Sequence, residues 1–140
     1  MRRIVPLFVA VAVTGLALAR VPVVAHHSFA AEFDANSPIN LTGVVTKIEW
    51  MNPHVWFYLD VKDKAGNVTS WGMEMGSPNG LMRQGWTRNT LKVGDVVTVE
   101  GSQAKDGSHV GNARVVVLAA TGKRLFAASS QDNPSQQQHR

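Results

Sequence analysis

The chain has 140 residues, no cysteine and a formal net charge of +4 at pH 7. This length suits one domain with one core, and the lack of cysteine excludes disulfides, thiolate metal sites and a lipid-anchored lipoprotein. The basic residues are scattered among acidic ones and form no stripe, so the composition does not favour a nucleic-acid-binding protein.

Residues 1–25 have the features of a secretory signal peptide. A positively charged start precedes an apolar run at 4–19, and Val23 and Ala25 suit the −3 and −1 positions of a cleavage site. The alternative is an uncleaved membrane anchor, but the run is shorter than the roughly 20 residues of a spanning helix and Arg20 interrupts it. We therefore expect cleavage after Ala25, no stable membrane anchor afterwards, and a periplasmic or secreted protein.

Cleavage changes the charge of the protein. It removes Arg2, Arg3 and Arg20 from the fourteen basic residues, which leaves eleven against ten acidic residues and a net charge of +1. The basic character of the whole chain therefore gives no reason to expect a nucleic-acid partner.

The rest of the chain divides into three parts. Residues 26–38 are expected to form an N-terminal arm that ends in a loop at 35–38. Residues 39–128 are expected to form one β-rich domain, and 129–140 to be a disordered tail, because the tail has no apolar side chain to bury. The strands predicted in chain order are 41–50, 54–62, 68–75, 95–103, 109–119 and 124–127.

The clearest strand pattern lies at 54–62, where apolar residues alternate with other residues. One face is formed by Val55, Phe57, Leu59 and Val61, and the other by His54, Trp56, Tyr58 and Asp60. A hairpin turn with Gly66 follows, because glycine readily adopts a positive φ.

A short helix is predicted after the third strand. Ser77 suits the N-cap, Pro78 the first helical position, and Gly85 the end of a helix that runs to Gln84. Its N-terminus offers N–H groups to an anion, but a capped connector is the interpretation that we favour. Ser77 has no partner base in the sequence, and we expect no enzyme.

Three strands, a short helix and two or three further strands are the order of an OB-like fold. We therefore predict an all-β protein: a small, OB-like closed β-barrel of five to six strands with one short helix between strands 3 and 4. The alternative that this spacing leaves open is a β-sandwich.

Long segments of the chain are similar to a known family. They are HHSFAAEFD, LTGVVTKIEWMNPHVWFYLDV, WGMEMGSPNGLMRQGWTR, LKVGDVVTVEGSQAKDGS and KRLFAAS. Over about residues 26 to 130 the chain resembles small exported bacterial proteins of unknown function, domain-of-unknown-function family 6152. The resemblance implies a periplasmic, OB-like barrel and no assigned activity.

Histidines suggest a metal site. Cleavage after Ala25 would place His26 at the new N-terminus beside His27, and an α-amine with imidazole nitrogens suits copper or zinc. His54 follows a proline, and Glu49 and Glu74 lie near strand ends and could add oxygen ligands. The alternative is that His54 hydrogen-bonds a loop carbonyl.

Aromatic residues suggest a second kind of site. Trp56 and Tyr58 share a face with His54, and the second and third strands of OB barrels commonly bind ligands. With Trp86 and Arg83 they could bind a small molecule, a glycan or a partner protein. The alternative is that the N-terminal arm, anchored by Phe29 and Phe33, covers this face.

Overall fold

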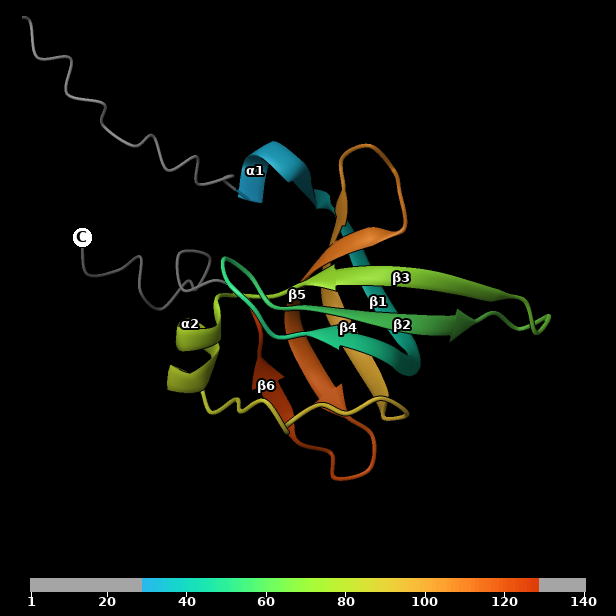
Figure 1. The fold of residues 1–140 in the computed structure, drawn as a ribbon. Coiled ribbons are helices and arrows are strands. Elements are labelled where there is room, and N and C mark those ends of the chain that lie inside the picture. Colours follow the sequence, from blue (N-terminus) through green and yellow to red (C-terminus); the bar gives the residue numbers. More distant parts are fainter. Residues whose placement is uncertain (1–28, 129–140) are drawn as a thin grey trace, which may run out of the picture.

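A computed structural model describes residues 29–128 of the chain. The elements are α1 (Phe29–Glu32), β1 (Phe33–Glu49), β2 (Trp56–Lys62), β3 (Val68–Glu74), α2 (Pro78–Arg83), β4 (Val96–Ala104), β5 (Val110–Leu118) and β6 (Arg124–Phe126) (Figure 1). The expected signal peptide, His26, His27 and the expected tail at 129–140 lie outside these residues. Neither α1 nor α2 has the length and apolar character that would let it cross a membrane.

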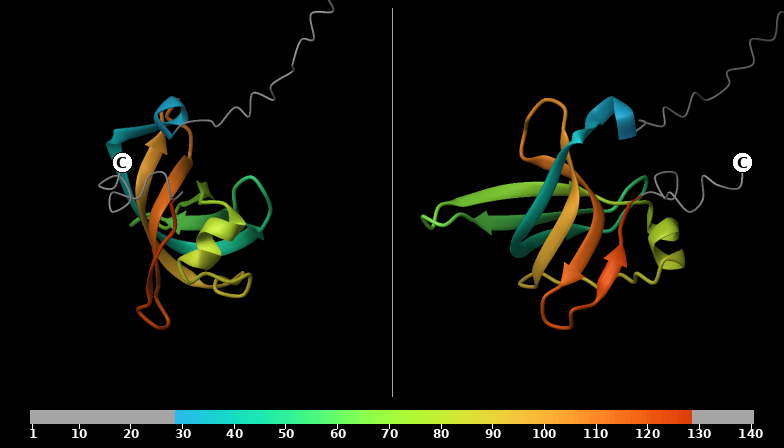
Figure 2. Two further views of the ribbon diagram at one scale, coloured as in Figure 1. Left: turned by 90° about the vertical axis from the view of Figure 1, so that its left-hand side faces the viewer. Right: turned by 180° about the vertical axis from the view of Figure 1, so that it is seen from behind.

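The six strands form one sheet in the order β3-β2-β1-β4-β5-β6, and an additional pairing joins β3 to β5. This pairing is parallel, from Gly72 opposite Val110 to Glu74 opposite Asn112, and it completes a ring of five strands. Figure 2 shows the sheet curling around on itself. The predicted all-β class is confirmed: the fold is small and barrel-like, with α2 between the third and fourth strands.

The core fills the interior of this ring. Val55, Phe57 and Leu59 are completely buried, which confirms the facing predicted from the alternation. Met73 on β3 and Val97 on β4 are also completely buried and belong to the same apolar cluster. A chain without disulfides therefore owes its stability to close packing of these side chains.

The N-terminal arm differs from the prediction. The expected loop at 35–38 is part of β1, which begins at Phe33 and pairs with β4 from Phe33 opposite Ala104 onward. The register shifts between Phe33 and Pro38. Within that irregular segment Asp34 accepts hydrogen bonds from the Asn36 N–H at 2.8 Å and the Ser37 hydroxyl at 3.0 Å. Hydrogen bonds to the Asp34 side chain therefore replace some of the hydrogen bonds between β1 and β4 that the register shift interrupts.

The helix α2 forms as predicted. Ser77 Oγ accepts a hydrogen bond from the Gly80 N–H at 3.2 Å, and Pro78 occupies the first turn. The chain leaves the helix through Gly85, whose φ of +95° suits glycine. Leu81 is completely buried in the core, so α2 is a capped connector that contributes to packing.

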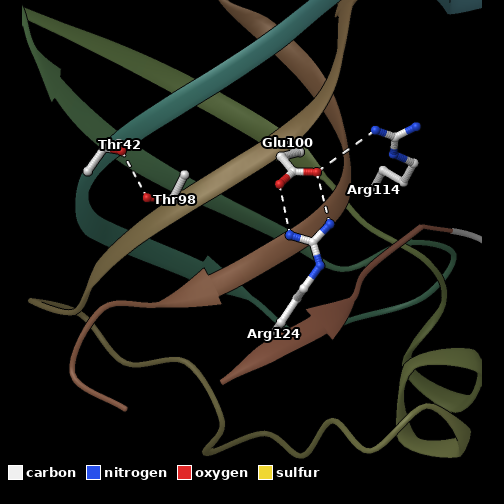
Figure 3. Close-up of polar contacts among 5 residues, drawn as sticks. All are labelled: Thr42, Thr98, Glu100, Arg114 and Arg124. Atoms are coloured by element: carbon white, nitrogen blue, oxygen red, sulfur yellow. Dashed lines mark hydrogen bonds and ion pairs between the residues drawn. The ribbon is translucent and has the colours of Figure 1, made fainter. Parts of the chain in front are cut away.

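The short strand β6 is tied to β4 across β5. Arg124 donates hydrogen bonds to both carboxylate oxygens of Glu100, at 2.8 and 3.1 Å, and Arg114 lies 3.9 Å from the same carboxylate (Figure 3). Thr42 and Thr98 share a hydrogen bond of 2.9 Å between β1 and β4. These contacts lie on the outside of the sheet, away from the core.

Candidate functional site

His54 and Glu74 meet at one end of the strand pair β2–β3. The Nδ1 atom of His54 lies 2.8 Å from Oε1 of Glu74. Backbone hydrogen bonds from Val55 N to Gly76 O and from Met75 N to Val55 O hold the two chain segments together. Pairing between β2 and β3 therefore brings together two residues that are far apart in the sequence.

The two partners differ in their exposure to solvent. The Glu74 side chain is only 11% exposed, whereas 32% of the His54 side chain is exposed. A buried carboxylate needs a polar partner, and His54 provides one. When Nδ1 donates to Glu74, Nε2 is the ring nitrogen left to take a proton or a ligand.

Glu49 belongs to a separate cluster with Tyr58 and Lys47. Tyr58 donates its hydroxyl to Glu49 Oε2 at 3.1 Å, and Lys47 Nζ lies 2.5 Å from Glu49 Oε1. The hydrogen bond from Lys47, followed by that from Tyr58, lowers the pKa of Glu49. Burial, followed by the hydrogen bond to Glu49, raises the pKa of Tyr58. Lys47 Nζ also lies 5.2 Å from the centre of the Tyr58 ring.

The strand register keeps Glu49 apart from the His54–Glu74 pair. Glu49 lies opposite Trp56, and Trp56 lies opposite Glu74, so Trp56 occupies the position between the two carboxylates. Within residues 29–128 no three His, Asp or Glu residues gather closely enough to hold a metal ion. Of the predicted metal ligands in this range, the structure brings together His54 and Glu74.

Trp56 and Tyr58 lie over Gly72 on the outer face of the sheet. A Cβ atom at Gly72 would be 3.3 Å from Cε1 of Tyr58 and 3.8 Å from Cζ3 of Trp56. Both aromatic residues are half-buried. Glycine at position 72 therefore leaves room for the two rings to lie close to β3.

The described part of the arm is held near the turn between β4 and β5. Phe29 stacks on Phe33, with ring centres 5.7 Å apart, and Phe33 is 3% exposed. The Lys105 N–H donates to the Glu32 carbonyl at 2.9 Å, and Lys105 Nζ bonds the Ala30 carbonyl. Phe29 and Phe33 therefore hold this part of the arm near the β4–β5 turn and not over the face of Trp56 and Tyr58, which both remain partly exposed.

Trp86, predicted as a ligand-binding residue beside Trp56 and Tyr58, lies in the core of the protein. Trp86 is 1% exposed, belongs to the core and donates its indole N–H to the Phe126 carbonyl at 2.8 Å. The turn at Gly85 directs the chain back toward the interior, and a large apolar ring gains most from burial there. Arg83 is exposed at the end of α2, and its side chain has no hydrogen bond or ion pair with a residue in 29–128.

Sequence reasoning missed Lys47 and Gly72 as neighbours of the aromatic pair. Lys47 lies opposite Tyr58, and Tyr58 lies opposite Gly72, so the three residues form one row across β1, β2 and β3. These neighbours depend on the register between β1 and β2. A bulge between Val45 and Lys47 shifts that register, and a pattern within one strand does not reveal it.

The sequence of the chain matches a known protein family. The sequence model of a family of unknown function (DUF6152) matches residues 13–113, which is most of the chain. No curated protein matches the chain. The family therefore supplies no activity or ligand for the residues described above.

Proposed function

This chain belongs to the family of unknown function DUF6152, and we propose that it is an exported binding protein that holds a transition metal ion, copper or zinc, at His54. In this proposal Nε2 of His54 is a metal ligand, and Glu74 orients the ring from behind. Residues His26 and His27 of the processed N-terminus supply further nitrogen ligands.

One observation carries the proposal. Glu74 Oε1 lies 2.8 Å from Nδ1 of His54, and the carboxylate is buried while the imidazole reaches solvent. Metal-binding histidines typically donate their second ring nitrogen to a carboxylate or carbonyl in this way, which fixes the tautomer and makes the ligating nitrogen more basic. A buried carboxylate also adds negative charge near the cation.

The site needs ligands from outside residues 29–128, because His54 and Glu74 are too few to hold the ion. Cleavage after Ala25 would give His26 a free α-amine beside its own imidazole. An amine and imidazole nitrogens suit copper(II). This supports the N-terminal histidines as partners of His54.

The test is the metal content of the exported protein, purified without a tag and measured by mass spectrometry. We expect about one copper or zinc ion per chain. His54→Ala should lower metal affinity at least about tenfold, whereas His109→Ala is the matched control, since His109 packs on Trp71 with ring centres 5.0 Å apart. Equal affinity of the two variants would exclude His54 as a ligand.

The N-terminus is tested separately. Sequencing of the exported protein should begin at His26, and one extra residue before His26 should lower copper affinity by displacing the amine. Binding should also weaken below about pH 6, because imidazole must be neutral to bind a metal. An uncleaved, membrane-embedded product would contradict the export proposal.

A second candidate function is supported by the two aromatic rings that lie over Gly72. Trp56 and Tyr58 lie two positions apart in β2, so their half-buried rings share one face, a pattern suited to stacking on a sugar or another planar ligand. Binding of a glycan fragment by calorimetry, lost in Trp56→Ala and kept in His54→Ala, would favour this function over metal binding.

A further inference from the structure

The outer face of the sheet has an apolar hollow at the end of β2 away from His54. Its volume is about 380 Å³, and its lining includes Val44, Val68 and Val96. Val44 lies opposite Val96 on β4, and Val68 lies opposite Lys62 on β2. Valines from three different strands therefore meet on one outer surface.

These valines are unusually exposed for their type. Val44, Val68 and Val96 are 43%, 54% and 44% exposed. They make up half of the six large hydrophobic side chains that are exposed in residues 29–128. Single exposed apolar residues are common, but a cluster around a hollow is typical of an interaction surface.

Charged residues border the same hollow. Asp60 and Lys62 lie two positions apart on β2, so both point to the outer face, and both line the hollow. Asp60 accepts a hydrogen bond from the Ser70 hydroxyl at 2.5 Å, which keeps the carboxylate on this face. The apolar surface thus has one acidic and one basic group beside it.

A rigid hairpin extends this surface. Figure 1 shows the β2–β3 hairpin projecting beyond the rest of the sheet. In its turn Asp63 accepts hydrogen bonds from the backbone N–H groups of Ala65 at 2.8 Å and Asn67 at 2.9 Å. Because the turn is already ordered, little conformational freedom would be lost when the hairpin contacts a partner.

We propose that the hollow is the interface of a symmetric dimer and that its partner is a second copy of this chain. In a twofold arrangement the valines of the two copies pack together, while Lys62 of each copy faces Asp60 of the other. A uniformly acidic or basic partner would leave one of these charges facing a like charge, whereas a second copy matches both. The interface is independent of the metal proposal.

Sedimentation equilibrium of the untagged protein over a wide concentration range tests this proposal. We expect the mass to rise from that of one chain to that of two. Val44→Lys should weaken the dimer by about tenfold or more, because it places a charge among the valines. Val93→Lys is the matched control, since Val93 is 66% exposed but does not line the hollow, and it should leave the dimer unchanged.

The charges allow a second test that does not depend on Val44. Lys62→Asp should weaken the dimer, and the double variant with Asp60→Lys should restore it, because the exchanged charges again face opposite partners. Circular dichroism confirms that each variant is folded. A protein that stays monomeric at millimolar concentration, or a dimer that responds equally to Val44→Lys and Val93→Lys, would overturn the proposal.

Discussion

His54 Nδ1 and Glu74 Oε1 lie 2.8 Å apart, so an almost buried carboxylate positions a histidine whose side chain is 32% exposed. The contact joins the segment before β2 to the end of β3. A fixed imidazole needs less ordering when it binds a ligand than a mobile one does.

Glu74→Gln should lower metal affinity about 10- to 100-fold, because the amide can still accept from Nδ1 but carries no charge. Calorimetric titration with copper or zinc measures the change. Glu49→Gln is the control, since Glu49 is bonded to Lys47 and Tyr58 and lies across Trp56 from the pair. The proposed role of Glu74 is wrong if both variants bind equally well.

Val97→Asp should lower the free energy of unfolding by about 4 kcal/mol or leave the domain unfolded, because a charge without a partner would be buried. Val97 is completely buried, while its neighbour Val96 is 44% exposed. Val96→Asp should therefore cost less than about 1 kcal/mol in dilute solution. Urea unfolding followed by tryptophan fluorescence compares them, and similar losses would contradict the facing of β4.

Gly101→Ala should destabilise the protein by about 3 kcal/mol or more, because the added methyl group would clash with backbone atoms of β5, which cannot move aside as easily as a side chain. A Cβ atom at Gly101 would overlap the Asn112 carbonyl oxygen and lie 3.0 Å from its carbonyl carbon. At Gly80 the nearest atom is Ser77 Oγ at 3.1 Å, and alanine favours a helix. Gly80→Ala should therefore stay within about 1 kcal/mol of the original protein in thermal unfolding. Near-equal stability of the two variants would show that β4 and β5 separate readily at Gly101.

Glu100→Gln should cost about 1 kcal/mol at pH 7, and this difference should disappear in acid. The hydrogen bond from Arg124, and then its charge, lower the pKa of Glu100 below the ordinary value of 4.5. A lowered pKa stabilises the fold at pH values above 4.5, and this contribution is lost as the pH falls through the pKa of the folded protein. Urea unfolding at several pH values measures both proteins, and a constant difference down to pH 2 would contradict this role.

Local sequence patterns predicted much of the fold. The alternation from Val55 to Val61 showed which side of β2 faces the core, since successive side chains on a strand point to opposite faces. Ser77 and Gly85 predicted both ends of the short helix, because an N-cap hydroxyl and a positive φ are local requirements.

The start of β1 was not predicted, because Asn36, Ser37 and Pro38 favour a loop when considered alone. Pairing with β4 overrides that preference. In the irregular segment, the Asp34 carboxylate accepts hydrogen bonds from the Asn36 N–H and the Ser37 hydroxyl. Trp86 was likewise assigned to a surface site, although its ring is buried and its N–H is bonded to Phe126.

The sequence by itself determined the all-β class, the facing of β2 and the residue types available for a site. Their grouping was decided by the tertiary structure: strand register pairs His54 with Glu74, separates Glu49 from both, and brings Val44 next to Val96. The physical reason is that side-chain direction follows from two-residue periodicity within one strand, whereas neighbours across strands depend on hydrogen-bond register and bulges, which form only when the sheet closes.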